Sequence, residues 1–470
     1  MSRAKVSATQ NPMATNSGLA TPPLTGEPGL SGPYSVFPVT NDDARVRGEL
    51  ERLLAAARDI RPTLRERQAR TEEDGQYGPD VHEYFLEHDF YKVLLPRRFG
   101  GLELGVPAFF ALIAEVGRGC PSTAWCLSLS VAHTLTLSSY WPLEAQDEVF
   151  GKLGYMIAPA SGNPTVATAV PVEGGFRVSG KWRYCSGAPY STHFFPTVMI
   201  PATDDEPEYR AWIVVDREDY TVLDDWGRVI GMRGSGSNGI EMTDVFVPAN
   251  RVVAETWTSE VAEPTVGYCI HGNPLYSGVF FGFAEGEVAA AAVGLGYAAV
   301  DEYERIIRTT RAPFDPNGGL RADSDDWRRV LGMAMAKVDA AAGALFDGGR
   351  KYEEFARRLV TAGETFDAGR AMRLNNQYFV VEELVWEALQ ELIRTAGTGF
   401  SADGQAMQRY FRDIWTTVSR TDQFQFFAAP AMAFHFAGEA GYDQAVEADG
   451  VAETDDATDD RAPLTGGAAA

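Results

Sequence analysis

Cysteine is scarce in this chain, and its few cysteines show none of the spacings used for metal binding or cross-linking. The sequence has four cysteines among 470 residues and no Cys-x-x-Cys pair. A zinc site needs closely spaced cysteines and histidines, and a disulfide framework needs dense pairs of cysteines. We therefore expect no metal and free thiols in a reducing cytoplasm at Cys120, Cys126, Cys185 and Cys269.

Positive charge and long apolar runs are also lacking. The sequence has 41 lysines and arginines against 65 acidic residues, which gives a formal net charge of -24. This balance argues against electrostatic attraction to nucleic acids or anionic membranes, and a phosphate-bearing ligand would need a local basic pocket. No run of about eighteen apolar residues occurs, and the N-terminus has no basic start followed by an apolar stretch. We expect a cytoplasmic protein that is neither secreted nor membrane-spanning.

The chain does have the length and the apolar content for a large folded core. Its 470 residues are 45% hydrophobic, which predicts an enzyme-sized globular protein with two to four domains. Residues 1–40 are rich in Ser, Thr, Pro and Gly, and residues 441–470 are acidic with many small side chains. Both segments have too little apolar surface to offset the entropy of ordering, so they are expected to be disordered tails.

The hydrophobic period changes twice between these tails. Apolar residues recur at helical spacing in residues 41–153, where Asp42 or Asp43 is the expected N-cap of the first helix. Residues 154–255 contain short β-rich segments separated by Gly, Pro and Asp, which indicates a barrel or sandwich. Long helical runs return in residues 256–440 and predict an antiparallel bundle. The expected fold class is α+β with three domains.

A glycine-rich polar loop leads into a β-like segment between Gly231 and Pro248. Its glycines allow sharp turns and a close approach of the backbone to a ligand, while Ser235, Ser237 and Asn238 supply short hydrogen-bonding groups. Taken alone, the loop is better explained as a glycine-rich hairpin that binds no ligand.

Four segments, in chain order, resemble motifs of the acyl-CoA dehydrogenase superfamily. They are Leu95–Leu102 (Leu-Pro-Arg-Arg-Phe-Gly-Gly-Leu), Phe176–Trp182, Gly231–Pro248 and Arg409–Asp413 (Arg-Tyr-Phe-Arg-Asp). The resemblance covers roughly residues 45–440. It implies an N-terminal helical domain, a central β-barrel or sandwich and a C-terminal four-helix bundle.

Two departures separate the chain from the true dehydrogenases of this superfamily. Thr416–Phe436 contains no glutamate to act as the base that removes a proton from a thioester, and Ile157–Gly162 lacks the usual flavin-loop pattern. The segment Cys120–Trp125 (Cys-Pro-Ser-Thr-Ala-Trp), with His133 eight residues after the tryptophan, instead resembles the oxygenase components of two-component flavin-dependent monooxygenases.

This second resemblance implies a chemistry and a set of partners. It implies a diffusible reduced FMN or FAD from a separate NAD(P)H:flavin reductase, O2, and a C4a-hydroperoxyflavin that hydroxylates a small phenolic substrate or oxidises an amine-bearing one. It also implies a homotetramer or homodimer. An FAD-dependent oxidoreductase of the acyl-CoA dehydrogenase type and a non-catalytic scaffold with the same fold remain as alternatives.

The resemblance also suggests catalytic residues. Ser186, in Trp182–Gly187, implies a hydroxyl close to the flavin N5, where a hydrogen bond and the absence of water limit peroxide loss. His133 and Ser161 are expected to face the substrate, the histidine polarising or deprotonating a phenol. The alternatives are a core histidine bonded to a backbone carbonyl, and a turn hydroxyl in Ser161-Gly-Asn-Pro.

The expected cofactor-binding residues are more widely spread. Arg233, Arg311 and Arg412 are candidates for the flavin phosphates because guanidinium groups match phosphate oxygens. Arg412 has a structural alternative, pairing with Asp413 or Asp422. The complete set implied by the resemblance is Trp125, Trp182, Ser186, Arg233, Ser235, Arg311, Phe314, Gly397, Gly399 and Arg412, with Trp182 equally able to fill the β core.

Arg420 stands where many oxygenases of this class have a histidine, seven residues after the Asp of the Arg-Asp motif. A guanidinium stays charged and does not act as a general base. It is suited to clamping an anionic group of the substrate or stabilising a phenolate or peroxide, which keeps oxidation of an amino sugar nucleotide or of a carrier-bound substrate open. A structural salt bridge is the alternative.

Overall fold

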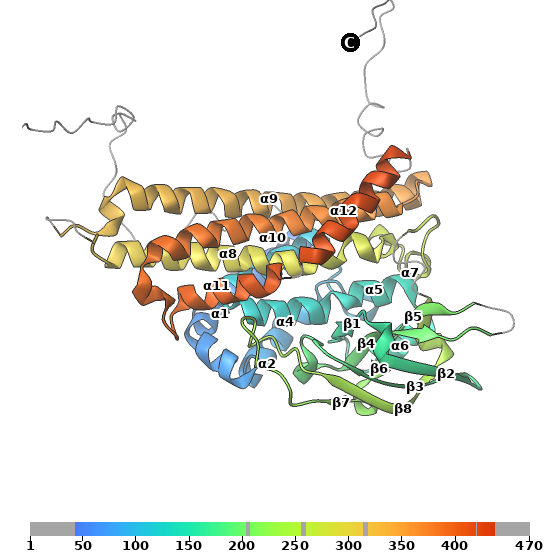
Figure 1. The fold of residues 1–470 in the computed structure, drawn as a ribbon. Coiled ribbons are helices and arrows are strands. Elements are labelled where there is room, and N and C mark those ends of the chain that lie inside the picture. The colour runs from blue at the N-terminus through green and yellow to red at the C-terminus, as the bar shows by residue number, and fades with distance from the viewer. Residues whose placement is uncertain (1–42, 204–206, 255–259, 314–317, 420, 438–470) are drawn as a thin grey trace, which may run out of the picture.

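The computed structural model describes residues 43–203, 207–254, 260–313, 318–419 and 421–437, and of residues 421–426 only the backbone. The two predicted tails, Phe314 and Arg420 lie outside the described residues. In chain order the described elements are helices, then strands, then helices, as the change of hydrophobic period predicts (Figure 1).

Six helices make up the first part of the chain. The predicted N-cap is present, since the Asp43 side chain accepts a hydrogen bond from the Arg45 backbone N–H. The following apolar positions of the first helix, from Val46 to Leu64, face the core. The helices are α1 (Ala44–Asp74), α2 (Pro79–Glu87), α3 (Val106–Gly119), α4 (Pro121–Val131), α5 (His133–Tyr140) and α6 (Leu143–Phe150).

The strands between Ala160 and Ala254 form two sheets with a hydrophobic core of their own. One sheet has the order β1 (Ala160–Ser161), β4 (His193–Ile200), β5 (Tyr209–Ile213) and β9 (Val252–Ala254), with β6 (Val215–Asp216) also paired to β4. The other has the order β2 (Ala167–Val172), β3 (Gly175–Trp182), β8 (Ile240–Pro248) and β7 (Thr221–Val222).

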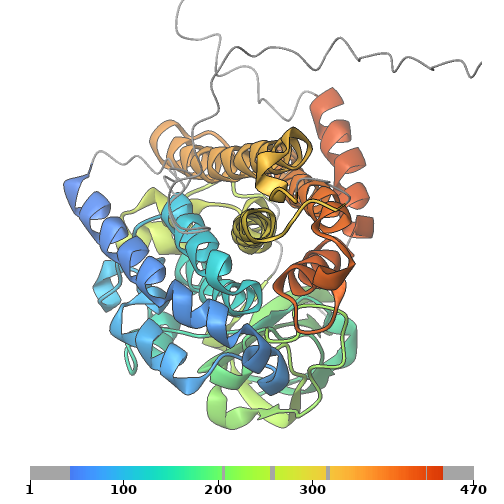
Figure 2. The ribbon, with the colours of Figure 1, turned by 90° about the vertical axis from the view of Figure 1, so that its left-hand side faces the viewer.

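Long helices complete the described chain. They are α7 (Val266–His271), α8 (Ala284–Thr309), α9 (Asp325–Ala362), α10 (Ala368–Ala396), α11 (Ala406–Val418) and α12 (Thr421–Phe436). Figure 2 shows α8 end-on at the centre of the helical part. The stretch Phe280–Thr309 is long and apolar enough to cross a membrane by composition, but 94% of its apolar window is buried in the protein, as in a core helix.

Buried ion pairs attach the first helices to the bundle. The guanidinium group of Arg118 on α3 donates from Nε and Nη2 to the two carboxylate oxygens of Asp301 on α8, each over 2.7 Å. Arg65 on α1 bonds to the same carboxylate. A bidentate arginine–carboxylate pair fixes orientation as well as distance, so these three helices are held in one arrangement.

Candidate active site

A chain of hydrogen-bonded side chains connects α4 with the glycine-rich loop. Trp125 Nε1 donates to Ser186 Oγ over 3.0 Å, Ser186 Oγ lies 2.7 Å from Ser237 Oγ, and Ser237 Oγ lies 2.7 Å from Ser235 Oγ. We call these four residues the serine chain. Its three serines are buried, so their hydroxyl groups are shielded from bulk water.

The sheet topology explains why these serines meet. Strands β3 and β8 are antiparallel neighbours, and Trp182 at the end of β3 pairs with Ile240 at the start of β8. The segment after β3, which carries Ser186, therefore leaves the sheet beside the loop before β8, which carries Ser237. Two serines 51 residues apart in sequence come into contact in this way.

Gly187 brings this segment against α4. Its φ of 87° lies in the left-handed region, and a Cβ atom added there would lie 2.0 Å from Ser130 Oγ. Its backbone N–H donates to the carbonyl oxygen of Ser235 over 3.1 Å. Glycine is thus required both for the turn and for the close approach to the helix that carries Trp125.

A cavity of about 270 Å³ adjoins the serine chain at Ser237. The rings of Tyr184 and Trp226 meet edge to face at its wall, 5.8 Å between centroids. Trp226 Nε1 is buried and has no hydrogen-bond partner among the residues that the structure describes. The lining residues include Arg183, Tyr184, Asp225, Trp226, Arg228 and Ser237. Aromatic rings, guanidinium groups and an unused buried donor fit a planar, anionic ligand such as the flavin that the resemblance implies.

His133 lies at the bend between α4 and α5 and is 4% exposed. Its Nδ1 is 2.7 Å from the carbonyl oxygen of Ala158, to which only a protonated Nδ1 can donate. Burial lowers the pKa of His133 to about 4, although the carbonyls of Ala158 and Leu129 act in the opposite direction. Near neutral pH the ring is therefore uncharged, and Nε2 carries the free lone pair.

An aromatic wall surrounds this histidine. The His133 ring stacks on Phe195 of β4, with centroids 5.4 Å apart and planes inclined by 15°. Phe195 also contacts Trp141 and Trp212, at centroid distances of 5.1 and 5.3 Å. Trp212 in turn meets the edge of Phe280 at 4.6 Å. The Phe195 ring on which His133 stacks is thus part of a continuous cluster of aromatic side chains.

The depressed pKa of His133 predicts an acid-sensitive contribution to stability. Because the folded pKa is about 4 and the usual value is 6.5, the unfolded chain binds the proton more tightly between these pH values. The contribution is complete above pH 6.5 and is lost as the pH falls towards 4, for a total of about 3 kcal/mol. Urea unfolding at pH 7 and pH 4.5 should show a smaller loss in His133→Asn than in the wild type. Equal losses would contradict this explanation.

Ser161 belongs to the strand beside this wall. Strand β1 runs parallel to β4, with Ala160 opposite Phe195 and Ser161 opposite Pro196. Ser161 is half-buried. In this register the Ser161 side chain shares a face of the sheet with Pro196, while His133 stacks on Phe195 on the other face. The structure therefore does not bring the Ser161 hydroxyl to His133.

Trp182 occupies a different environment from Trp125. It is fully buried in the core of the β sheets and meets Phe194 edge to face at 5.2 Å. A Cβ atom added at Gly180 would lie 2.6 Å from the Trp182 ring, so that glycine makes room for the indole. Trp182 therefore fills the β core, which sequence reasoning allowed as the alternative to a place beside the flavin.

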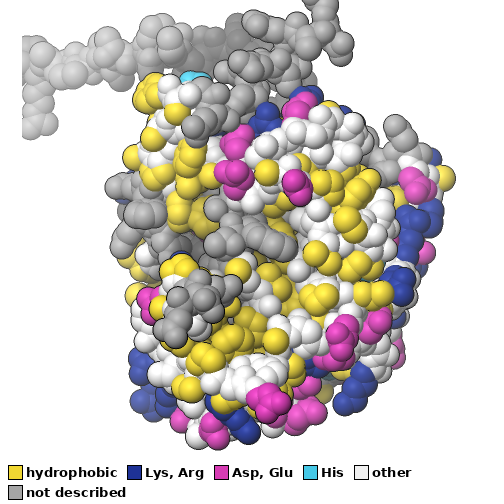
Figure 3. Space-filling view, turned by 90° about the vertical axis from the view of Figure 1, so that its right-hand side faces the viewer, with side chains coloured by type: hydrophobic (Ala, Val, Ile, Leu, Met, Phe, Trp, Pro, Cys, Tyr) yellow, Lys and Arg dark blue, Asp and Glu magenta, His cyan; other side chains and the backbone are white. Residues whose placement is uncertain are grey.

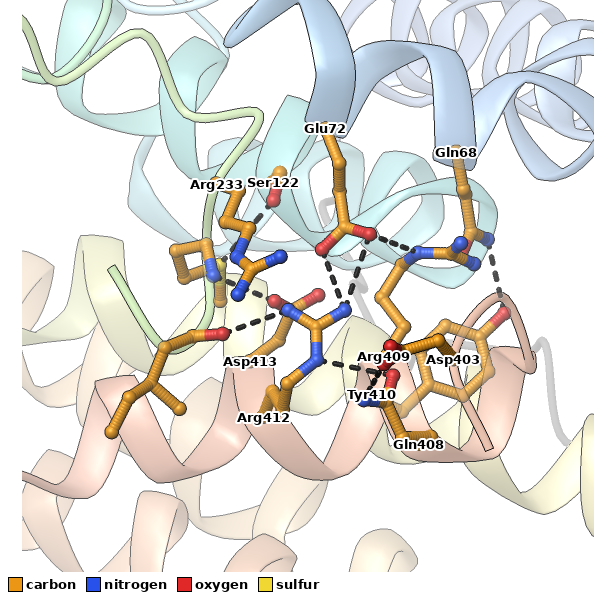
Figure 4. Close-up of polar contacts among 12 residues, drawn as sticks. Gln68, Glu72, Ser122, Arg233, Asp403, Gln408, Arg409, Tyr410, Arg412 and Asp413 are labelled. Atoms are coloured by element: carbon orange, nitrogen blue, oxygen red, sulfur yellow. Dashed lines mark hydrogen bonds and ion pairs between the residues drawn. The ribbon is translucent and has the colours of Figure 1, made fainter. Parts of the chain in front are cut away.

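Arg412 and Arg233 lie at the outer side of the glycine-rich loop (Figure 4). Arg412 Nη2 bonds to the two carboxylate oxygens of Glu72 at 2.8 and 3.1 Å, and Nη1 donates to the carbonyl oxygen of Ile230 at 2.7 Å. Arg233 Nε donates to the carbonyl oxygen of Val229 at 2.8 Å. Arg412 is thus paired with Glu72 on α1, a partner that the sequence did not predict.

Arg311, Gly397 and Gly399 lie where α8 and α10 end and α9 begins, at the left-hand end of the bundle in Figure 1. Arg311 Nη1 donates to the carbonyl oxygen of Gly318 over 2.9 Å. Gly397 ends α10 with a φ of 103°, and nothing lies within 4 Å of a Cβ added at Gly399. In the part of the chain that the structure describes, the contacts given for Arg311 and Gly397 are with Gly318 and Arg321, not with the serine chain.

Sequence reasoning missed the part played by Ser237. It singled out Ser235 as a cofactor residue, yet Ser237 is the member that bonds directly to Ser186. The signal was the spacing Ser235-Gly236-Ser237, because a glycine between two serines lets the backbone turn so that the hydroxyls meet. Gly236 has a φ of 55°, in the left-handed region, and the two Oγ atoms are 2.7 Å apart.

Comparisons with known proteins agree with the fold and the motifs. Residues 48–147 match the acyl-CoA dehydrogenase N-terminal domain and residues 287–421 match the acyl-CoA dehydrogenase C-terminal domain. The solved structure of XiaF from Streptomyces sp., in complex with FADH2 and glycerol, superposes with a TM-score of 0.73 at 22% identity and covers 84% of this chain and 97% of that one. The chain belongs to the acyl-CoA dehydrogenase superfamily.

Curated relatives show which class of enzyme within this superfamily the chain resembles. The oxygenase subunit HsaA of a flavin-dependent monooxygenase from Rhodococcus jostii is 29% identical over 355 residues, 75% of this chain and 89% of the relative. The oxygenase component of an FADH2-dependent resorcinol hydroxylase from Rhizobium sp. is 28% identical over 356 residues, 73% of this chain and 84% of the relative. The prediction of a two-component flavin-dependent monooxygenase, rather than a dehydrogenase, is confirmed.

Proposed function

We propose that this protein hydroxylates a small phenolic substrate with O2 and a reduced flavin from a separate reductase. The observation that carries the proposal is the buried serine chain, which connects the Trp125 indole through Ser186 to Ser237 at a cavity suited to a flavin. When bound, the reduced flavin supplies the electrons that activate O2 for transfer of one oxygen atom to the substrate.

The residues near the serine chain are proposed to bind the flavin and to orient its reacting edge. Ser186 is the hydroxyl that hydrogen-bonds the reacting edge of the flavin, with its direction set by Trp125 and Ser237. The burial of all three serines keeps water from that edge, which limits unproductive release of peroxide. Arg183 and Arg228 supply positive charge at the cavity for the phosphate of FMN or FAD.

His133 is the residue that orients and polarises the phenol. With Nδ1 bonded to Ala158, its Nε2 accepts the hydrogen bond of the phenolic O–H and raises the electron density of the ring. The aromatic wall at Phe195 places the substrate ring. Arg420 is proposed to bind an anionic group of the substrate.

A homodimer or homotetramer completes the flavin site in this proposal. Arg311, Phe314, Gly397 and Gly399 would serve the flavin of a neighbouring subunit, while Arg233 and Arg412 support the loop of their own subunit. In support, apolar side chains gather on the face shown in Figure 3, and Met432 and Phe436 of α12 are exposed. The division into three domains and a cytoplasmic location belong to the same proposal.

The proposal is tested by supplying photoreduced flavin, ¹⁸O2 and a panel of simple phenols, resorcinol included. One labelled oxygen atom is expected in the product, detected by mass spectrometry. Complete conversion of the flavin electrons to hydrogen peroxide with every phenol would overturn phenol hydroxylation.

Ser186→Ala is expected to uncouple flavin oxidation from hydroxylation without unfolding the protein. Loss of the hydroxyl removes the group proposed to bond the flavin, and one hydrogen bond of about 1.4 kcal/mol corresponds to a tenfold effect. Hydrogen peroxide released relative to product should therefore rise about tenfold. The matched control is Ser191→Ala, because Ser191 is equally buried but bonds to Tyr220 and Ala188. Equal peroxide release in both variants would remove Ser186 from the flavin site.

A further inference from the structure

Helix α11 contacts three consecutive residues, Ile230, Gly231 and Met232, where the glycine-rich loop begins (Figure 4). Arg412 Nη1 donates to the carbonyl oxygen of Ile230 over 2.7 Å, and Asp413 Oδ1 accepts from the backbone N–H of Met232 over 2.6 Å. Gly231 lies between them, so close to α11 that an added Cβ would be 2.0 Å from the carbonyl oxygen of Arg412. The loop is therefore seated on α11 through its backbone, not through apolar side chains alone.

This contact maintains an unfavourable backbone conformation. Met232 has a φ of 53°, a left-handed value that costs a non-glycine residue about 1 kcal/mol or more. Such a conformation persists only where its surroundings impose it. Asp413, which is 1% exposed, accepts the N–H of this residue, and Ser122 Oγ contacts its Sδ at 3.9 Å.

A backbone hydrogen bond joins Met232 directly to Ser235 of the serine chain. The carbonyl oxygen of Met232 accepts a hydrogen bond from the Ser235 backbone N–H over 3.1 Å, which closes a tight turn. Ser235 Oγ then bonds to Ser237 Oγ, and Ser237 Oγ to Ser186 Oγ. Four hydrogen bonds therefore lead from the Asp413 carboxyl group to Ser186.

We infer that Asp413 is a positioning residue, which acts through the Met232 N–H to align Ser235, Ser237 and Ser186 at the flavin cavity. This inference rests on the proposed function, because it assigns the purpose of the alignment to flavin binding. It also gives the Arg-Asp motif of α11 a role at the cofactor site, although the aspartate itself contacts only the loop.

The charged surroundings of Asp413 predict how this alignment depends on pH. Burial raises the pKa of Asp413 to about 7, while the Met232 N–H acts in the opposite direction. The titratable and charged groups that face it are Glu72 on α1, Arg409 and Arg412 on α11, and Cys120 between α3 and α4. An ionised carboxylate is the stronger acceptor, so the loop is held better above pH 7. Flavin affinity is expected to rise through that pH.

The contribution of Asp413 to the stability of the folded protein is expected to change with pH in the opposite direction to flavin affinity. Because the folded pKa of Asp413 lies above its usual value of 3.8, the native protein binds this proton more tightly than the unfolded chain does. The contribution of Asp413 to stability therefore falls as the pH rises from about 4 to about 7. Tighter flavin binding in the same direction distinguishes positioning from a general gain in stability.

The experiment compares Asp413→Ala and Asp413→Asn with the wild type in two assays. One measures anaerobic binding of photoreduced FMN at pH 6 and pH 8, and the other measures amide hydrogen exchange in residues 231–237. Asp413→Ala is expected to bind FMN about tenfold more weakly and to exchange faster, since one buried hydrogen bond is lost. Asp413→Asn keeps a neutral acceptor oxygen, so it should bind FMN about as the wild type does at pH 6 and should not gain affinity at pH 8.

Leu392→Ala is the control for a general loss of stability, because Leu392 is fully buried on α10. At a comparable melting temperature it should keep wild-type flavin affinity. Equal loss of affinity in Leu392→Ala and Asp413→Ala, or wild-type affinity and exchange in Asp413→Ala, would overturn the inference. If Asp413→Ala does not fold, a pH dependence retained by Asp413→Asn would overturn it. A wild type that binds no flavin would refute the proposed function, while hydrogen exchange would still decide whether Asp413 holds the loop.

Discussion

Replacement of His133 by alanine is expected to slow product formation about 100-fold to 10,000-fold, the usual contribution of a positioned acid–base group. Nδ1 of His133 donates a hydrogen bond to the carbonyl oxygen of Ala158, and burial lowers the pKa of His133 to about 4. In the proposed function the ring, uncharged near neutral pH, would present Nε2 to the phenol. The measurement is the rate of hydroxylated product at saturating reduced flavin and O2.

Flavin binding provides the internal check on this variant. His133→Ala should bind reduced flavin as the wild type does, because the serine chain and its cavity do not include this residue. His271→Ala is the matched control, since His271 is half-buried on α7 and bonds to Gln146 over 2.8 Å. A His133→Ala enzyme with wild-type product yield would assign this histidine to the core, bonded to a backbone carbonyl.

Asp301→Ala is expected to lower the free energy of unfolding by about 3 to 5 kcal/mol, because it leaves a buried guanidinium without its partner. Arg118 loses two hydrogen bonds of 2.7 Å, and Arg65 loses its contact with the same carboxylate. The side chains of Arg118 and Asp301 are each only 6% exposed, so water does not replace these bonds in the folded state. Urea unfolding at pH 7, followed by circular dichroism, measures the change.

An exposed ion pair gives the contrast for this prediction. Glu354 bonds to Arg357 and Arg358 over 2.7 Å on α9, but these side chains are largely accessible to water. Glu354→Ala is therefore expected to cost about 0 to 1 kcal/mol. Similar losses in the two variants would show that burial does not decide the strength of these ion pairs.

The motifs of the sequence located most of the parts of the site. The resemblance to family motifs predicted Trp125, Ser186 and Ser235 at a flavin site, and the structure brings all three into one hydrogen-bonded chain. Local patterns were sufficient here because each motif specifies its own turn or helix. The pairing of β3 with β8 then carries the segments to one place.

Other parts were beyond sequence reasoning because their partners are distant along the chain. Glu72 and Arg412 are 340 residues apart, and nothing in either segment indicates the other. Trp125 and Trp182 both occur in family-like motifs, yet one bonds to Ser186 and the other fills the β core. Which face of a strand or helix points to a ligand depends on how that element pairs or packs with its neighbours. This pairing cannot be read from a single sequence.

The sequence by itself determined the class of this protein. The change from helical to strand periodicity and back, the glycine-rich loop from Gly231 to Pro248 and the absence of a glutamate after the Arg-Asp motif are local features, readable residue by residue. Only the tertiary structure decided that Asp413 meets Met232, that Ser237 meets Ser186 and that burial keeps His133 uncharged. The physical reason is that hydrogen bonds between distant segments and the desolvation of a titratable group arise from packing, which exists only once the chain has folded.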